Sequence, residues 1–114
     1  MRPEERDQAY AWDMLQAAEE IREMLGDRDV TAFLGSRMLM RAIERNLEII
    51  GEAAGRLSPS FREAYSDIPW RQIIGQRNIL AHEYGQIDHE LLFRSASEDI
   101  PELVMRLRQI IPDQ

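Results

Sequence analysis

The 114-residue sequence contains no cysteine, which excludes disulfide bonds and zinc sites built from thiolates and fits a reducing cytoplasm. It also lacks any apolar run near the roughly 18 residues that a membrane-spanning helix needs, and its first residues do not have the pattern of a signal peptide. We therefore expect a cytoplasmic protein that makes no contact with a membrane. Hydrophobic residues at 44% and charged residues at 31% are typical of a globular chain, and the length fits a single domain over residues 1–114.

Lysine is absent too, so all 14 basic residues are arginine, against 21 acidic residues and a net charge of −7. This acidic balance argues against nonspecific binding to nucleic acid. Because a guanidinium group matches the geometry of phosphate, a local anion site remains compatible with the acidic chain. A genome rich in G and C, whose codons favour arginine over lysine, explains the lack of lysine more simply.

No stretch alternates apolar and polar residues with the period of a β-strand; apolar residues instead recur three and four positions apart. The predicted helices cover residues 3–25, about 38–57, from 69 onward, and about 89–110. Gly26 is a natural C-cap for the first helix, Asp88 is an N-cap for the last, and Pro101 should kink the last. We expect an all-α, antiparallel bundle of four main helices with a short extra helix.

Two smaller features refine this prediction. Ser60 and Glu63 have the spacing of a capping box, which predicts that the short extra helix is capped by Ser60. The linker from Asp27 to Gly35 should hold at most one short turn, around Phe33.

The second helix carries an apolar arc broad enough to face two neighbours. Gly51 and Gly55 should let another helix approach it closely. A four-helix bundle needs only one apolar side per helix, so the surplus apolar surface indicates a homodimer.

Residues 76–84 gather the most chemically capable side chains of the chain and include His82, one of only two histidines. A lone histidine on an apolar helix is more often a hydrogen-bonded structural residue than a catalyst. On a straight helix Arg77 and His82 are splayed by roughly 140°, whereas Asn78 and His82 share one face. For the first pair to converge, the arginine must reach round, the helix must end near His82, or a second copy must complete the site.

Other chemistries are harder to reconcile with the sequence. It has no Glu-x-x-His, His-x-x-x-His or His-Glu-x-x-His pattern of the kind that binds metals on helices, and no glycine-rich phosphate loop. What remains is a site without metal or cofactor, built on an imidazole and a guanidinium group. That pair suits cleavage of a phosphodiester, since imidazole transfers protons near neutral pH and guanidinium neutralises phosphate charge.

The spacing Arg77, four residues, His82, one residue, Tyr84 resembles the motif of the HepT family of HEPN-domain toxins, including the Asn78 that often follows the arginine. Three further segments resemble other parts of that family and follow one another in the same order. These segments are residues 45–53, 68–75 and 99–101. The resemblance therefore covers nearly the whole chain.

The resemblance implies a homodimeric helical bundle whose two motifs face each other across a cleft. It also implies a metal-independent ribonuclease within a type VII-like toxin–antitoxin module. In this family a nucleotidyltransferase of the MNT type, encoded beside the toxin, acts as antitoxin by adenylylating the motif tyrosine. Carried over to this chain, Arg77 binds or polarises the scissile phosphate of RNA and His82 transfers protons, with the RNA 2′-hydroxyl as nucleophile. Asn78 supports the site, and Tyr84 accepts the AMP groups.

Position 83, which is free in the motif, is glutamate here. The carboxylate of Glu83 repels RNA phosphates and, together with the net charge of −7, argues against strong activity. An alternative reading is a non-catalytic helical dimer that serves as a substrate-binding or regulatory subunit of a nucleotidyltransferase. The presence of Arg77, His82 and Tyr84 together favours the ribonuclease, because a scaffold needs none of them.

Overall fold

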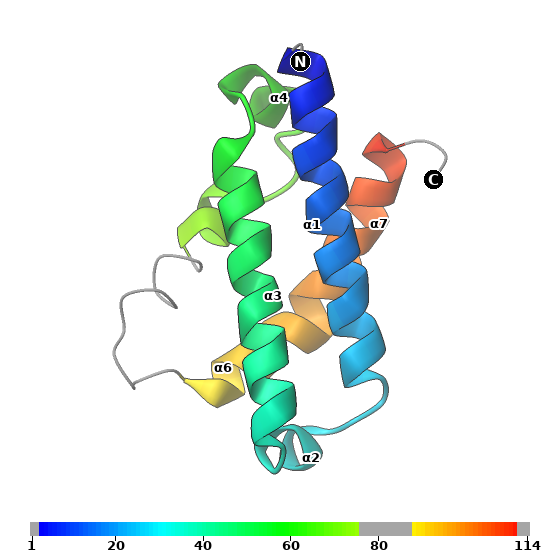
Figure 1. Ribbon diagram of the computed structural model, residues 1–114, viewed down its shortest axis with the longest axis vertical. Coiled ribbons are helices and arrows are strands. Elements are labelled where there is room, and N and C mark those ends of the chain that lie inside the picture. The colour runs from blue at the N-terminus through cyan, green and yellow to red at the C-terminus, as the bar shows by residue number, and fades with distance from the viewer. Residues whose placement is uncertain (1–2, 76–87, 112–114) are drawn as a thin grey trace.

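The computed structural model describes residues 3–75 and 88–111 of the chain, and every regular element among these residues is a helix (Figure 1). In order, the elements are α1 (Pro3–Leu25), α2 (Val30–Leu34), α3 (Arg37–Arg56), α4 (Pro59–Ala64), a helical stretch over 70–75, α6 (His89–Arg94), the π-helix η1 (Ser95–Asp99) and α7 (Ile100–Ile110). The prediction of an all-α bundle is confirmed. None of the described helices is both long enough and apolar enough to cross a membrane.

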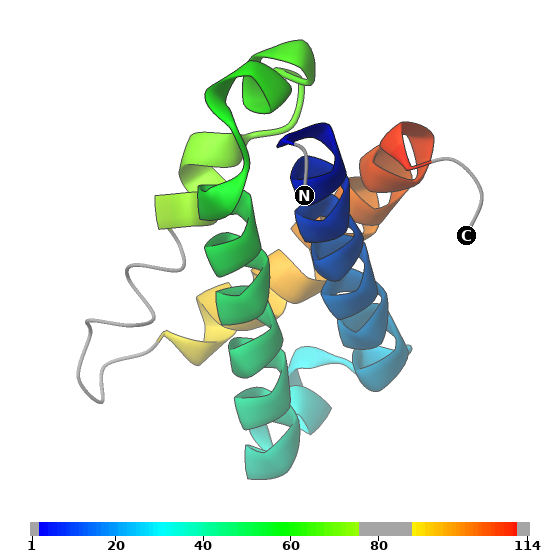
Figure 2. The same cartoon turned by 45° about the horizontal axis from the view of Figure 1, so that its top comes forward.

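The long helices α1 and α3 lie side by side and run in opposite directions, and α7 packs on α1 as well (Figures 1 and 2). At one end of the bundle, α2 contacts both α3 and α6. The stretch over 70–75 lies beside α3 on the side away from α1 (Figures 1 and 2). The helices therefore surround one core, to which α1 contributes by packing on α3, η1 and α7.

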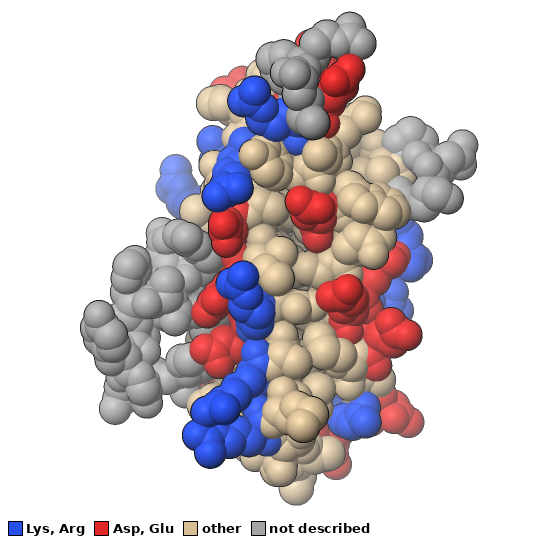
Figure 3. All heavy atoms as spheres, in the orientation of Figure 1, with Lys and Arg blue, Asp and Glu red and all other residues tan. Residues whose placement is uncertain are grey.

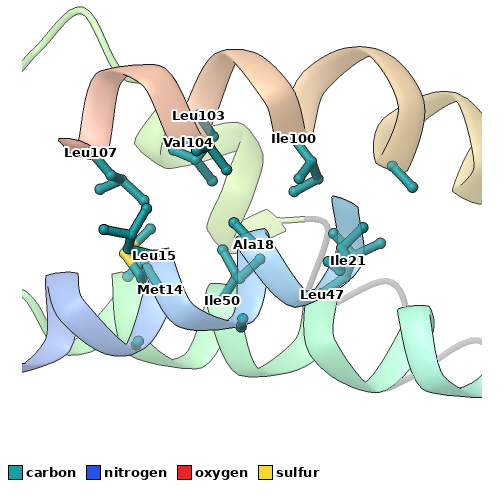
Figure 4. Packing of buried hydrophobic residues seen from close by; sticks show 14 of the residues in the cluster. Met14, Leu15, Ala18, Ile21, Leu47, Ile50, Ile100, Leu103, Val104 and Leu107 are labelled. Carbon is teal, nitrogen blue, oxygen red and sulfur yellow. The ribbon is translucent and has the colours of Figure 1, made fainter. Parts of the chain in front are cut away.

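Charged side chains spread over the outside of the molecule, with both signs interleaved along α3 in the view of Figure 3. Inside, apolar side chains of α1, α3 and α7 point toward one another (Figure 4). Met14 and Leu15 of α1 face Leu107 of α7, and Ile50 of α3 lies beside them. These are the positions that recur three and four residues apart in the sequence, so the periodicity predicted the core correctly.

Several helix ends follow the signals in the sequence. Gly26 ends α1 with a φ of +56°, a left-handed conformation that glycine adopts without strain, as predicted. Three side chains cap the N-termini of α2, α3 and α6 by accepting a hydrogen bond from the backbone N–H three residues on: Asp29, Ser36 and Asp88. The linker before α3 is more ordered than predicted, since α2 spans five residues and its Phe33 is fully buried against Phe93, with ring centroids 5.5 Å apart.

The cap of α4 is Ser58, so the prediction of a capping box starting at Ser60 is wrong. The Ser58 hydroxyl accepts a hydrogen bond from the Phe61 N–H at 3.2 Å. The buried Asp7 carboxylate in turn accepts from the Ser58 N–H at 2.9 Å and from the Ser58 hydroxyl at 2.7 Å. The reason is Pro59, which suits the first helical position and so makes the preceding residue the cap.

The prediction of close helix approach at two glycines of α3 is wrong at one of them. Gly51 is buried, but Gly55 is exposed, and a side chain there would meet no atom within 4 Å. In the described part of the chain, the pair is therefore not a helix-packing motif.

Pro101 follows a π-helical segment that interrupts the last predicted α-helix. The chain stays helical from α6 to α7, but through the π-helix η1, where the Ile100 N–H donates to the Ser95 carbonyl five residues back. Proline has no N–H to donate to the carbonyl four residues before it, which disrupts the α-helical ladder at this point. The path of the chain turns between α6 and α7 (Figures 1 and 2), as the predicted kink requires.

We predict that Ser58→Ala lowers the free energy of unfolding by about 0.5–2 kcal/mol, because it removes the cap of α4 and a partner of the buried Asp7. Ser60→Ala is the matched control and should change stability far less. Urea unfolding of both variants measures the difference. Equal losses would contradict the assignment of the cap to Ser58 alone.

Candidate functional site

The predicted site residues Arg77, Asn78, His82 and Tyr84, with Glu83 among them, lie in residues 76–87, outside the described residues. The structure describes the two ends that hold this segment. The chain enters it after Gly75 and leaves it at Asp88. Consecutive Cα atoms are about 3.8 Å apart, so covalent geometry alone keeps the Cα atom of Arg77 within about 7.6 Å of that of Gly75.

The entering end is anchored by Trp70, which is only 8% exposed. Its indole N–H donates to two carbonyls near the end of α4, those of Arg62 at 3.1 Å and Tyr65 at 3.0 Å. The Ile73 N–H donates to the Pro69 carbonyl at 3.1 Å, which closes the first helical turn. The helix that leads into the motif therefore starts from a fixed position against α4.

The leaving end is fixed by the cap at Asp88, and His89, the second histidine, follows it. His89 is half-buried and its charge acts on Glu44 of α3. Partial burial and the charge of Glu48 raise the pKa of Glu44, while His89 and Arg41 oppose the shift. The proximity of His89 to Glu44 was not predictable, because no sequence pattern links residues so far apart.

A cavity of about 520 Å³ lies between the two ends. Gly75 lines it from the entering side and Leu91 of α6 from the leaving side, while Ile50 of α3 and Leu103 of α7 line its apolar part. Both ends of the segment 76–87 thus border one cavity.

Comparison with known proteins identifies the family. The family model described as "Ribonuclease HepT-like" matches residues 14–110, a span that includes the whole motif. The chain belongs to the HepT-like ribonuclease family. The predicted family resemblance is confirmed.

Three relatives match the HepT-like chain over most of its length. "Putative RNase MJ1380" of Methanocaldococcus jannaschii is 39% identical over 95 residues, which cover 83% of this chain and 87% of the relative. "Putative RNase TTE0752" of Caldanaerobacter subterraneus subsp. tengcongensis is 35% identical over 102 residues, covering 90% and 91%. "Probable ribonuclease HepT" of Thermococcus cleftensis is 35% identical over 94 residues, covering 82% and 86%. No solved structure gives a significant match.

The rim of the cavity in this HepT-like chain is acidic. The Arg106 guanidinium donates to the carboxylates of Glu102, at 2.9 Å, and of Asp67. The hydrogen bond to Glu102 is the main cause that raises the pKa of Arg106. Asp99 lines the cavity as a third carboxylate, and its pKa is raised by partial burial and by the charges of Glu98 and Glu102.

Three carboxylates against one guanidinium make this rim a poor place for a phosphate group. The described lining also holds no imidazole. Among the described residues, no three histidine or acidic side chains lie close enough together to hold a metal ion. The described lining of the cavity therefore offers apolar surface and ion pairs rather than catalytic groups. The ion pair between Glu102 and Arg106 was predictable from the sequence, because the two residues are four positions apart on one helix. The ion pair between Arg106 and Asp67 was not predictable, because the two residues are far apart in the sequence.

We predict that Asp99→Asn raises the free energy of unfolding at neutral pH. A raised pKa means that the folded protein binds this proton more tightly than the unfolded chain does. The wild type should therefore lose stability relative to the variant as pH rises above the ordinary value of 3.8 and through the raised pKa, and the two should converge below 3.8. Urea unfolding across this range measures the difference.

Glu23→Gln is the control, because it removes one negative charge from the exposed side of α1, away from the cavity. It should lack the pH-dependent gain. A wild type that is as stable as Asp99→Asn at neutral pH would contradict the electrostatic description of the rim.

Proposed function

We propose that the chain is a metal-independent endoribonuclease that acts as the toxin of a toxin–antitoxin module. The observation that carries this proposal is the family match over residues 14–110, which spans Arg77, His82 and Tyr84 at the motif spacing. Relatives that align with most of the chain bear names of ribonucleases, which supports RNA as the substrate.

The chemistry follows from the two side chains at the centre of the motif. His82 takes the proton from the RNA 2′-hydroxyl, whose oxygen attacks the neighbouring phosphorus. The bond from phosphorus to the 5′-oxygen breaks and that oxygen receives a proton, which leaves a 2′,3′-cyclic phosphate and a free 5′-hydroxyl. Arg77 neutralises the charge that builds on the phosphate, and Asn78 supports the pair. No step requires a metal ion.

Two copies of the chain form the working unit in this proposal. A second motif facing the first across a cleft resolves the splay of Arg77 and His82 on one straight helix. A dimer also covers the surplus apolar surface of the second predicted helix, of which Met38 is 83% exposed in the single chain. Sedimentation at micromolar concentration should give the mass of a dimer.

The partner in this proposal is an MNT-type nucleotidyltransferase that transfers AMP to Tyr84. A bulky anion there would occupy space that RNA phosphate needs and repel it. Arg77 could pair with the new phosphate, so one modification would both block the substrate and occupy a catalytic group.

We predict that Arg77→Ala and His82→Ala each lower the rate of RNA cleavage by about 10²–10⁴-fold in the presence of a metal chelator. His89→Gln, at the only other histidine, is the matched control and should retain cleavage. Circular dichroism should show that all variants remain helical. Cleavage by His82→Ala near the wild-type rate would contradict the assigned roles.

The same variants separate the proposal from its alternative. A substrate-binding or regulatory subunit of the nucleotidyltransferase would cleave no RNA and would not arrest growth when expressed alone. It would still bind its partner with Arg77 or His82 replaced. Growth arrest that depends on both residues supports the toxin, and its absence in the wild type supports the subunit.

We predict that co-expression with the neighbouring nucleotidyltransferase adds mass in steps of one AMP, mapped to Tyr84 by mass spectrometry. Tyr84→Phe should stay toxic in the presence of the partner, whereas Tyr10→Phe and Tyr65→Phe, at the half-buried tyrosines, should be neutralised like the wild type. If Tyr84→Phe is neutralised equally well without modification, the partner acts by binding alone.

A further inference from the structure

A second hollow adjoins the acidic cavity and opens on the surface between α4 and the helical stretch 70–75. It is an open cleft of about 940 Å³. Arg62 and Glu63 of α4 line it on one side, and Arg71, Gln72 and Gly75 line it on the other. Several basic side chains lie over this end of the molecule in Figure 3.

The two arginines of the cleft have no acidic partner among the described residues. The Nε atom of Arg62 is buried and makes no hydrogen bond there. Arg71 is exposed and takes part in no ion pair with the described part of the chain. By contrast, Arg106 at the acidic cavity is held by two carboxylates. Glu63 is the one acidic residue that lines the cleft, so its lining carries a net positive charge.

The cleft reaches the end of the described helix that leads to the motif. Gly75 lines it, and the Cα atom of Arg77 lies within about 7.6 Å of that of Gly75 by covalent geometry. The cleft therefore adjoins the point where the chain enters the segment 76–87, which holds Arg77. Guanidinium groups bind phosphate well, since their donors match its oxygens in pairs.

We propose that Arg62 and Arg71 form a phosphate-binding subsite that holds the RNA backbone beside the scissile bond. The proposal rests on the proposed function, because it takes RNA as the ligand. Trp70 does not offer its ring to a base, since it is 8% exposed and its N–H is already bonded within the chain. The contacts therefore fall on phosphates, and the subsite adds affinity without preference for a base sequence.

The test measures binding of a 12-nucleotide single-stranded RNA whose 2′-hydroxyls are all methylated, so that it cannot be cleaved. The double variant Arg62→Gln/Arg71→Gln should lower the slope of log K against log salt by roughly 1.4, because each phosphate of a single strand that is no longer neutralised lowers it by about 0.7. Between 50 and 200 mM salt, the affinity of the wild type should therefore fall by a factor about seven times larger than the factor by which the affinity of the variant falls. A deoxyoligonucleotide of the same sequence should show the same change.

Three variants control for charge and folding. Arg22→Gln/Arg108→Gln removes the same charge from the exposed surfaces of α1 and α7 and should leave the slope unchanged. Arg62→Lys/Arg71→Lys keeps the charge and should restore most of the slope. Arg71→Gln alone changes an exposed side chain and should lower the slope by about 0.7, whatever the effect of Arg62 on folding.

The outcomes separate this inference from the proposed function. If the slope is the same in the wild type and in Arg71→Gln, or if the wild type does not bind the methylated RNA, the subsite is wrong even when unmodified RNA is cleaved. If the slope falls as expected but unmodified RNA is not cleaved, the subsite stands and the ribonuclease proposal fails. If the slope falls equally in Arg22→Gln/Arg108→Gln, the effect comes from net charge alone and the subsite proposal is wrong.

Discussion

Burial of α1 between α3 and α7 is the interaction on which the rest of the structure depends. Met14, Leu15 and Ile21 of α1 are 0%, 1% and 0% exposed. Burying a side chain of this kind is worth about 1.5–3 kcal/mol, so these three alone approach the net stability of a small domain, about 5–15 kcal/mol. The chain has no cysteine with which a disulfide could replace this burial.

The same packing positions the ends of the motif-bearing segment. Because α1 holds both α3 and α7, it fixes two walls of the cavity that Gly75 and Leu91 complete. Trp70 adds a polar anchor, since its two hydrogen bonds reach back to carbonyls at the end of α4. Catalytic residues need rigid support to keep their geometry, and the packing provides support on both sides of the segment that holds the predicted site residues.

The fold was predictable from the sequence wherever one local signal acted alone. Gly26 ended a helix, Asp88 began one, and apolar spacing placed Leu103 and Leu107 in the core. Prediction failed where two local signals competed, as at Ser58 and Ser60, because Pro59 decided between them. The acidic cavity rim and the basic cleft were beyond prediction, since tertiary packing brings Asp67 to Arg106 and α4 to the stretch 70–75. The motif itself was recognisable from Arg77, His82 and Tyr84, and its geometry stays a prediction.

Local charge, not the net charge of −7, decides whether this chain suits RNA. Electrostatic attraction in salt acts over roughly 10 Å, so acidic side chains on far surfaces weigh little at a binding site. Within the described residues the carboxylates Asp67, Asp99 and Glu102 line one cavity, and two arginines that form no ion pair there line the cleft that adjoins it. The first repels a phosphate chain and the second attracts it, although both border Gly75. In the proposed RNA complex the strand lies along α4 and avoids the carboxylates near α7, so the proposed subsite gives the RNA a direction as well as added affinity.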